Sequence, residues 1–442
     1  MSQALSQKYD LRVPRYTSYP TSPHFSEAVG HETYRGWLEN LDPKTPLSLY
    51  THIPFCDEMC WFCGCFTKIV KKYEPVSDYL DVVLAEIDLL ADTLPGRFSA
   101  RHLHWGGGSP TMLTGADWMR TLDKLRSRFD IDEHSEIAVE MDPRTATEGY
   151  VKAVTDAGVN RASIGVQDFD AKVQEAIHRI QPYDVTARVV GWLRDHGVKS
   201  INMDLMYGLP HQTTELVLKQ IDLAHGLAPA RVALFGYAHV PWMKTHQKMI
   251  DEAVLPGADD RWEQLTMATE KLKDLGYVQI GFDHFARPDD EMAVALAEGR
   301  LRRNFQGYTV DDGQTLVGLG ASSIGNLPQG YAQNTQRLRQ YADEVKAGRF
   351  PVVKGFELTA EDETRRGIIE KIMCELTVDL GAFEERFEAE IDALSPLADD
   401  GIVALDGDRI TVTEEGRPFV RLVAATFDTY LASGKARHSR AV

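Results

Sequence analysis

The sequence predicts an α/β protein in which parallel strands and helices alternate to form a barrel, followed by a small, mainly helical domain with a β-hairpin. One local pattern occurs over residues 156–166, 195–205 and 274–282: a helical stretch ends at a glycine, and an apolar strand follows. Glycine at that position can adopt the left-handed conformation that ends a helix. Strands that alternate with helices form parallel sheets with right-handed crossovers.

Apolar stretches of strand length occur at intervals along the chain before the final domain. The expected strands are 47–54, 102–106, 136–141, 162–167, 201–206 and 231–237, with 277–282 as a further candidate. Between the first two strands, segment 77–91 has the period of an amphipathic helix, with Ser77 at the N-cap position. Polar residues concentrate where the strands end, among them Glu140, Asp142, Gln167 and Asp204. Because a barrel brings all its strand ends to one mouth, this pattern favours a barrel over an open sheet.

Residues from about 355 onward have a different pattern. An amphipathic helix is expected to begin at Thr359, with acidic residues in its first turn. Alternating segments on either side of Asp406 and Gly407 predict a β-hairpin, and 416–432 predicts a closing helix. These elements indicate a winged-helix-like domain. Its acidic stretches argue against DNA binding, because no cationic face is evident.

The charge balance restricts the classes of partner. The chain of 442 residues has 48 Lys and Arg against 66 Asp and Glu, a formal charge of −18. Nucleic acid and an anionic membrane surface are therefore not expected as partners, since binding to either requires a basic patch. No apolar stretch reaches the roughly 18 residues of a membrane span, and the N-terminus is polar, which indicates a cytoplasmic protein.

Four of the five cysteines lie within ten positions, as Cys56, Cys60, Cys63 and Cys65. Disulfides are disfavoured because a chain of this length can bury a sufficient core and cytosolic thiols stay reduced. A structural zinc is an alternative, although its usual second C-x2-C pair is missing. An iron–sulfur cluster fits better. If Cys65 does not reach the cluster, C-x3-C-x2-C supplies three thiolates and one iron stays open for another ligand.

These motifs resemble the radical S-adenosylmethionine (SAM) superfamily, whose C-x3-C-x2-C motif carries an aromatic residue, here Phe62, before its last cysteine. The longer string YTHIPFCDEMCWFCGC is similar to one branch, the oxygen-independent coproporphyrinogen III oxidases. The resemblance extends over nearly the whole chain. It includes VPRYTSYPT (13–21), LHWGGGSPT (103–111), GVQDF (165–169), NMDLMYGLP (202–210), DHFARPDDE (283–291), RNFQGYT (303–309) and YAQN (331–334).

The resemblance implies an incomplete, six-stranded (β/α)6 barrel of the radical SAM type. It divides the chain into three parts. Residues 1–45 form an N-terminal segment that contributes to the active-site cover, and 46–354 form the barrel and its extension. Residues 355–442 form a winged-helix-like cover domain.

The same resemblance assigns Cys56, Cys60 and Cys63 to one 4Fe–4S cluster. SAM would chelate the fourth iron of that cluster. Cys65 is expected to be a buried non-ligand thiol. One electron from the cluster would cleave SAM into methionine and a 5′-deoxyadenosyl radical. No side chain is assigned as catalytic, because the cofactor supplies the radical.

Two SAM molecules are implied. A glycine run lets the backbone approach a ligand closely, and a carboxylate at a strand end suits the hydroxyls of a ribose. The residues assigned to the first SAM are Tyr50, Glu140 and Ile324, with the glycine run, including Gly107, at its methionine end. Those assigned to the second are Phe62, Gly108, Ser109, Gln167, Arg179, Asp204 and Ala238. Without the resemblance, Arg179 and Asp204 would be interpreted as a structural ion pair or as exposed charges.

The function that the resemblance implies is oxygen-independent oxidative decarboxylation in haem biosynthesis. Two propionates of coproporphyrinogen III become vinyl groups, which gives protoporphyrinogen IX and consumes two SAM molecules. A haem chaperone on the same barrel is the alternative, but such relatives lack a cysteine matching Cys65 and the RYTSYPT segment (15–21). An electron-transfer protein without SAM would leave the glycine run, Glu140 and Asp204 unexplained.

The expected partners are the tetrapyrrole substrate and a reducing electron donor such as a flavodoxin-type protein. No coiled-coil heptads suggest self-association, so we expect a monomer. A tetracarboxylate substrate requires a basic lining inside this acidic chain, although Arg and Lys are more often solvated surface residues. The candidates for that lining are Arg12, Arg15, Lys68, Arg302 and Arg303.

Overall fold

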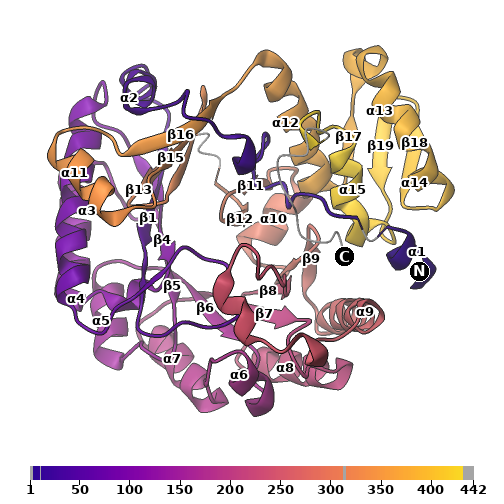
Figure 1. Cartoon of the computed structure of the whole chain (residues 1–442), viewed down its shortest axis with the longest axis horizontal. Coiled ribbons are helices and arrows are strands. Elements are labelled where there is room, and N and C mark those ends of the chain that lie inside the picture. Colours follow the sequence, from indigo (N-terminus) through magenta and orange to yellow (C-terminus); the bar gives the residue numbers. More distant parts are fainter. Residues whose placement is uncertain (1–2, 10, 312–314, 432–442) are drawn as a thin grey trace.

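A curved twelve-stranded sheet forms the centre of the molecule, and helices cover its outer face (Figure 1). The computed structural model describes residues 3–9, 11–311 and 315–431. From edge to edge the strands are β16 (Val352–Glu357), β15 (Gly330–Asn334), β14 (Ile324–Leu327), β13 (Thr315–Leu319), β1 (Leu47–Ile53), β4 (Ala100–Gly107), β5 (Glu136–Met141), β6 (Arg161–Gln167), β7 (Ser200–Tyr207), β8 (Arg231–Gly236), β10 (His284–Ala286) and β9 (Val278–Ile280). Because β16 and β9 are the two edges, the barrel is open along one side.

The parallel part of the sheet confirms the predicted barrel. The six predicted strands are β1, β4, β5, β6, β7 and β8, each parallel to the next. β13 pairs in parallel with the other side of β1 and was not predicted. The further candidate 277–282 shortens to β9, which pairs antiparallel with β10. That segment is therefore an edge strand and not a barrel strand.

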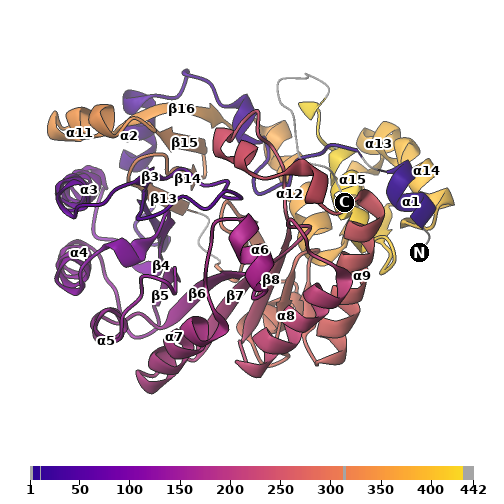
Figure 2. The same ribbon diagram turned by 60° about the horizontal axis from the view of Figure 1, so that its bottom comes forward.

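Helices connect the successive parallel strands and lie on the outside of the barrel (Figure 2). They include α3 (Glu74–Thr93), α4 (Gly115–Arg128), α5 (Glu148–Asp156), α6 (Ala171–Ala176), α7 (Tyr183–Asp195) and α8 (Thr214–Gly226), and α9 (Ala258–Asp274) follows β8. The predicted helix-ending glycines are confirmed, since Gly158, Gly197 and Gly276 have φ of 110°, 87° and 88°. The predicted N-cap is wrong: α3 begins at Glu74, with a proline in its first turn, so Ser77 lies inside the helix.

The N-terminal segment runs from the C-terminal domain to the opposite edge of the sheet (Figure 1). It contains α1 (Gln3–Lys8) and α2 (His31–Glu39). The hydroxyl of Tyr16 donates to Asp428 Oδ2 at 3.0 Å, and the hydroxyl of Tyr19 lies 3.1 Å from Thr429 Oγ1. Further along, Ser26 forms an antiparallel bridge with Gly355 in β16. The segment therefore links the C-terminal domain to the open edge of the barrel.

The C-terminal domain has the predicted helix and hairpin. Its elements are α12 (Ala360–Glu375), β17 (Thr377–Asp379), α13 (Glu388–Ala393), α14 (Ser395–Asp399), β18 (Val403–Asp406), β19 (Arg409–Val412) and α15 (Val420–Ala425). Thr359 caps α12 by accepting a hydrogen bond from the N–H of Asp362, which confirms the predicted start. β17 adds a third strand to the hairpin. The closing helix starts later than predicted because a 3-10 turn precedes it, and it ends at Ala425; residue 432 of the predicted range lies outside the described residues.

The two largest apolar cores are separate from each other. Apolar residues of the sheet and of α3, α4, α5, α7 and α8 form one core. The second combines the C-terminal domain with Tyr9, Val13, Tyr16 and Tyr19 of the N-terminal segment. β16 extends to Glu357 and belongs to the large sheet, past the residue at which the cover domain is expected to begin. Among the described residues, no helix has the length and apolarity needed to cross a bilayer.

Candidate active site

One cavity of about 180 Å³ gathers most of the predicted site residues. It lies beyond the carboxyl ends of β4, β5, β6 and β7, where a barrel of this type carries its chemistry. The predicted residues in its lining are Cys56, Cys60, Phe62, Cys63, Gly107, Gly108, Ser109, Glu140, Gln167, Arg179 and Asp204. Cys65 also lines it, and the side chain is exposed, whereas a buried thiol was expected. This confirms the prediction that polar residues at the ends of these strands meet at one mouth of the barrel.

The cysteine loop is closed by a short parallel pair, β2 (Phe55–Cys56) with β3 (Lys68–Ile69). Between them the N–H of Cys63 donates to the carbonyl of Cys60 at 3.2 Å, which turns both thiols toward the cavity. Trp61 attaches the loop to the segment after α6, because its ring stacks on His178 with centroids 5.1 Å apart. All five cysteines are free thiols.

The arrangement of thiols suits a cluster better than a single ion. In the part of the chain that the structure describes, no three His, Cys, Asp or Glu side chains converge on one metal position. A tetrahedral zinc needs such convergence. A cubane cluster instead places each thiolate on a different iron, so its ligands are spread around the cluster. Cys56, Cys60 and Cys63 around one cavity therefore fit a cluster.

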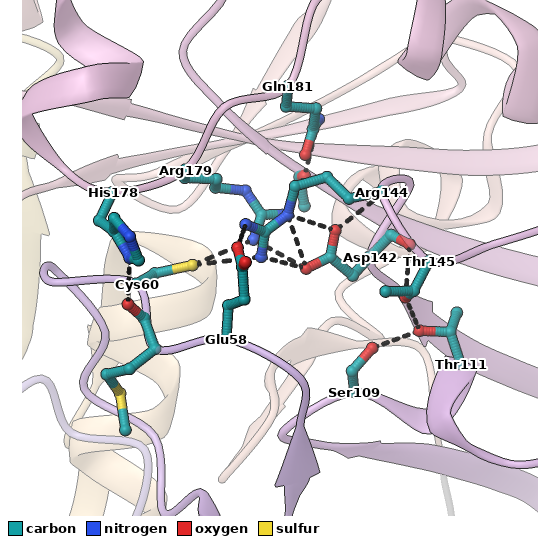
Figure 3. A network of polar contacts seen from close by, with 12 residues as sticks. Glu58, Cys60, Ser109, Thr111, Asp142, Arg144, Thr145, His178, Arg179 and Gln181 are labelled. Atoms are coloured by element: carbon teal, nitrogen blue, oxygen red, sulfur yellow. Dashed lines mark hydrogen bonds and ion pairs between the residues drawn. The ribbon is translucent and has the colours of Figure 1, made fainter. Parts of the chain in front are cut away.

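Two arginines donate hydrogen bonds to the sulfur of Cys60 (Figure 3). Arg144 Nη2 lies 3.4 Å and Arg179 Nη1 lies 3.5 Å from Cys60 Sγ. Both guanidinium groups also bind Asp142, at 2.7 Å and 3.1 Å. Burial raises the pKa of Asp142, but the Arg179 charge and the Arg144 hydrogen bonds outweigh it and lower that pKa to about 2.

The two arginines therefore give the sulfur of Cys60 hydrogen-bond donors, as the protein groups around a metal ligand commonly do. Arg179 is buried and already paired with Asp142, so its ion pair does not involve Asp204. Sequence reasoning did not identify Arg144. The only available signal was its position two residues after Asp142, directly beyond the end of β5.

The glycine run is required by close packing within the protein. A Cβ on Gly106 would lie 2.7 Å from Glu140 Oε1, and one on Gly108 would lie 2.7 Å from the carbonyl oxygen of Phe55. Gly107 has φ of 115°, a conformation that favours glycine. The N–H of Gly108 donates to the carbonyl of Ile53 at 2.8 Å. The run therefore joins the end of β4 to the cysteine loop.

Glu140 is held in its ionised form at the cavity wall. Its carboxylate lies 3.1 Å from His104 Nε2 and accepts a hydrogen bond from the N–H of Gly107 at 3.2 Å. Burial opposes ionisation, but these contacts, with His104 the stronger, lower the pKa of Glu140. An ionised carboxylate at this position can accept two hydroxyl groups, as the ribose role requires.

Asp204 has the opposite electrostatic environment. Burial, together with the nearby charge of Glu140, raises the pKa of Asp204 to about 6. Asn202 Nδ2 donates to it at 2.8 Å and Ser163 Oγ at 3.2 Å. Beside it, Gln167 has φ of 68° where the pairing of β6 and β7 shifts register. Such an irregularity redirects a side chain at a strand end.

The hydroxyl of Ser109 is engaged within the protein. It hydrogen-bonds to Thr111, whose Oγ1 lies 2.6 Å from Thr145 Oγ1, as Figure 3 shows. Thr145 in turn donates to the carbonyl of Asp142. Ser109 thus connects the glycine run to the loop that carries the Arg144 network.

Three predicted SAM contacts lie outside this cavity lining. Tyr50 Oη lies 3.0 Å from His52 Nδ1, and its ring stacks on His104. Ile324 begins β14, on the far side of β13 from β1. Ala238 follows β8, and its carbonyl accepts from Gln247 at 3.3 Å. The SAM role assigned to these three stays a prediction, as it does for the residues that line the cavity.

The basic candidates divide between two other cavities. Arg12 and Arg15 line a cavity of about 430 Å³ beside β7 and β8. Arg302 and Arg303 line one of about 170 Å³ that also contains Tyr16 and Tyr19. Lys68 is exposed and packs over the ring of Phe66.

Comparison with known proteins places this geometry in a family. Residues 50–224 match the model of the radical SAM superfamily, and residues 358–419 match that of the HemN C-terminal domain. An oxygen-independent coproporphyrinogen III oxidase of Bradyrhizobium diazoefficiens is 50% identical over 98% of this chain and 97% of its own length. The chain belongs to the oxygen-independent coproporphyrinogen III oxidase family.

Further relatives support this assignment. The Escherichia coli oxygen-independent coproporphyrinogen III oxidase is 39% identical over 97% of this chain and 95% of its own. The solved structure of coproporphyrinogen III oxidase (HemN) from Escherichia coli, described as a radical SAM enzyme, aligns with a TM-score of 0.91 at 38% identity, covering 95% of this chain and all of that one. The fold predicted from the sequence is therefore confirmed over nearly the whole chain. Membership of the radical SAM superfamily implies SAM and a 4Fe–4S cluster.

Proposed function

We propose that the protein oxidises coproporphyrinogen III to protoporphyrinogen IX without oxygen. The observation that carries this proposal is the single cavity in which three cysteines, the glycine run and an ionised Glu140 meet, in a chain that matches coproporphyrinogen III oxidases along nearly its full length. Each of two propionates would lose a hydrogen atom from its β-carbon, an electron and carbon dioxide, which leaves a vinyl group.

The bound cluster and SAM would supply a carbon-centred radical, and Cys56, Cys60 and Cys63 are the residues that would hold the cluster. The protein's own contribution is to position these groups and to exclude water. Three side chains of one loop bind the carbonyl groups of the cysteine loop: Gln247 Nε2 donates to Phe62 at 3.0 Å, His246 Nε2 lies 2.7 Å from the carbonyl oxygen of Cys63, and Lys244 Nζ donates to Cys65 at 3.2 Å. These contacts attach residues 244–247 to the cysteine loop.

Two SAM molecules are part of the proposal. Glu140 and Gly107 lie on one side of the cavity, and Gln167, Arg179 and Asp204 line it as well. Arg179 Nη1 is paired with Asp142 and Nη2 donates to the carbonyl of Gly165 at 2.7 Å. Its buried Nε has no hydrogen-bond partner among the described residues and would donate to a carboxylate while the ion pair with Asp142 is kept. The second SAM would therefore add to the Arg144 network without breaking it.

The C-terminal domain and residues 1–45 are proposed to cover the substrate. The core that the C-terminal domain shares with Tyr9, Val13, Tyr16 and Tyr19 supports this role, because Tyr16 and Tyr19 also line the cavity that contains Arg302 and Arg303. A carbon radical abstracts hydrogen from almost any neighbour, so the open side of the barrel has to be closed.

A reducing protein of flavodoxin type is the proposed electron donor, and the protein is proposed to act as a cytoplasmic monomer. The cysteine loop ends at the surface, where Cys65 is exposed and is followed by the exposed Lys68, Lys71 and Lys72. These cations suit an acidic partner, and their effect would decrease with ionic strength.

An anaerobic assay tests the proposed activity. The reconstituted protein is incubated with coproporphyrinogen III, SAM and a strong reductant, and protoporphyrinogen IX and 5′-deoxyadenosine are measured. We expect both products. A protein that binds haem tightly, cleaves SAM and forms no vinyl product would contradict the proposal and favour a haem chaperone.

A further inference from the structure

The cavity of about 430 Å³ has features that the cluster and SAM do not explain. It lies between the carboxyl ends of β7 and β8, the start of α9, the N-terminal segment and the C-terminal domain. Its apolar wall includes Trp242, Leu255 and Phe282. Ligand cavities typically combine such a wall with a few convergent polar groups.

The convergent groups here are cations. Arg12, Arg15, Arg261 and Arg421 line the cavity, and they come from the N-terminal segment, α9 and α15. Arg421 is buried, and burial together with the charge of Arg15 lowers its pKa to about 10. Clustering of these cations is unfavourable unless negative charge is placed among them.

The carboxylates of the cavity are already paired. Asp283 Oδ2 accepts from Arg15 Nη2 at 2.6 Å, and its Oδ1 lies 2.6 Å from His284 Nδ1. Glu252 Oε1 lies 3.0 Å from His239 Nε2. They therefore neutralise the Arg15 side of the cavity and leave Arg261 without a counter-ion.

Arg261 faces the cavity with its donors unused. Within residues 3–9, 11–311 and 315–431, its guanidinium group makes no hydrogen bond and no ion pair. Its guanidinium and the hydroxyl of Tyr207 both lie against Gly236: a Cβ at that position would be 3.4 Å from Arg261 Nη2 and 2.8 Å from Tyr207 Oη. A planar guanidinium beside a hydroxyl matches the two oxygens of a carboxylate.

We propose that Arg261, with Arg421 and the hydroxyl of Tyr207 beside it, binds one propionate carboxylate of the tetrapyrrole that is not being oxidised. This inference rests on the proposed function. The propionate chain would extend along the wall formed by Trp242 and Phe282. Two propionates of coproporphyrinogen III persist in the product, so a fixed anchor for one of them can serve the reaction throughout.

The cavity is a neighbour of the cluster cavity. Gln247 Nε2 donates to Ala238, which lines this cavity, and to Phe62, which lines the other. Along β7, Tyr207 lies three residues beyond Asp204, another residue of the cluster cavity. A macrocycle anchored at Arg261 would therefore extend toward the mouth of the barrel.

Binding of two stable porphyrins tests this anchor. Fluorescence titration would measure the affinity for coproporphyrin III and for protoporphyrin IX, which keeps only the two retained propionates. We expect Arg261→Gln to weaken binding of both by about ten-fold or more, since the lost hydrogen bonds are to a charged group. Arg261→Lys should recover part of the loss. In turnover, Arg261→Gln should raise KM for coproporphyrinogen III more than it lowers kcat, with unchanged iron content.

The matched control is Arg339→Gln, at an exposed arginine of α11 (Leu338–Lys346), which should bind as the unsubstituted protein does. Arg12→Gln, at the exposed rim of the cavity, should cause a smaller loss. If Arg261→Gln bound both porphyrins with unchanged affinity, the proposal that Arg261 anchors a propionate would be wrong. Loss of affinity for coproporphyrin III alone would overturn the assignment to a retained propionate. If the unsubstituted protein cleaves SAM but neither binds nor oxidises the tetrapyrrole, the proposed function itself is wrong.

Discussion

Cys60 differs from the other cysteines because Arg144 and Arg179 both donate to its sulfur. The spacing of the C-x3-C-x2-C motif alone does not distinguish Cys60 from Cys56 and Cys63. The two guanidinium groups reach Cys60 because Asp142 binds both of them and fixes their position. A substitution of Asp142 would therefore affect both hydrogen bonds to Cys60.

Iron content tests the ligand assignment. We expect Cys56→Ala, Cys60→Ala and Cys63→Ala to lose the cluster and all SAM cleavage, because each removes one thiolate. Cys65→Ala should retain most of its iron, since Cys65 is expected to be a non-ligand. Iron and sulfide analysis after anaerobic reconstitution gives the result. The assignment would be wrong if the Cys65 variant contained no iron while a variant of Cys56, Cys60 or Cys63 retained a full cluster.

SAM stoichiometry tests the two proposed SAM sites. Glu140→Ala should weaken the SAM that is cleaved, whereas Arg179→Ala should reduce binding from two equivalents to one. Loss of a hydrogen bond to a charged group costs about 1.5–3 kcal/mol, enough for a clear change in affinity. Anaerobic equilibrium dialysis measures the number bound. Saturation of the unsubstituted protein at one SAM per chain would contradict the second site.

The pKa of Asp204, raised to about 6 by burial and by Glu140, predicts a pH-dependent stability. The unfolded chain ionises this carboxyl near its ordinary pKa, so between about pH 4 and 6 the folded state binds more protons. Asp204 therefore lowers stability as the pH rises through that range. Asp204→Asn should raise the free energy of unfolding of the cluster-free protein by about 1–3 kcal/mol above pH 7, and by little below pH 4.

Urea unfolding at several pH values measures this difference. Asp123→Asn, at an exposed position on α4, is the control and should show no comparable pH-dependent gain. An equal gain for Asp204→Asn at pH 4 and pH 8 would show that ionisation is not the cause.

Among the elements, the turn after β4 connects the barrel to the cysteine loop. The backbone of Gly108 and Ser109 donates to Ile53 and Phe55, each at 2.8 Å, so the turn positions residues on both sides of the cluster cavity. A side chain at Gly108 has no room, because the backbone of Phe55 lies against it. The atoms that a Cβ would meet belong to the backbone, which cannot move aside as the end of a flexible side chain can.

Gly108→Ala should therefore displace the cysteine loop. We expect reduced iron incorporation and a lower melting temperature, corresponding to about 1–3 kcal/mol for an overpacked site. The matched control is Gly191→Ala in α7, where a Cβ would meet nothing within 4 Å. That substitution should be neutral or stabilising by about 0.5–1 kcal/mol. Normal iron loading of Gly108→Ala would show that the turn is more tolerant than its packing indicates.

In the whole molecule, the barrel and the C-terminal domain have separate cores, and the N-terminal segment contributes to both: Tyr9 to Tyr19 belong to the C-terminal core, and α2 belongs to the barrel core. A truncation should end after Glu357, because β16 belongs to the barrel sheet. We expect a protein lacking 358–442 to bind a cluster and cleave SAM, but to form 5′-deoxyadenosine with little protoporphyrinogen, since the radical is no longer enclosed.

The ratio of the two products in a folded truncation is the measurement. Because the truncation exposes Tyr16 and Tyr19, the full-length Tyr16→Phe variant provides a second test. It removes the hydrogen bond to Asp428 and should uncouple cleavage from product formation to a smaller degree. A truncated protein that keeps the full-length ratio would show that the domain does not cover the site.

The sequence by itself determined the parallel barrel, the helix-ending glycines, the cap at Thr359 and the cysteine loop. The glycines, the cap and the cysteine spacing are local patterns, visible in a short window. The barrel follows from the regular alternation of strands and helices along the chain. The tertiary structure decided which groups meet across the mouth: Arg144 and Arg179 at Cys60, and Arg261 and Arg421 in one cavity. It also placed β13 beside β1, whereas 277–282 became an antiparallel edge strand. Segments distant in the chain come together only when the barrel closes around its core, and a linear pattern contains no record of that pairing.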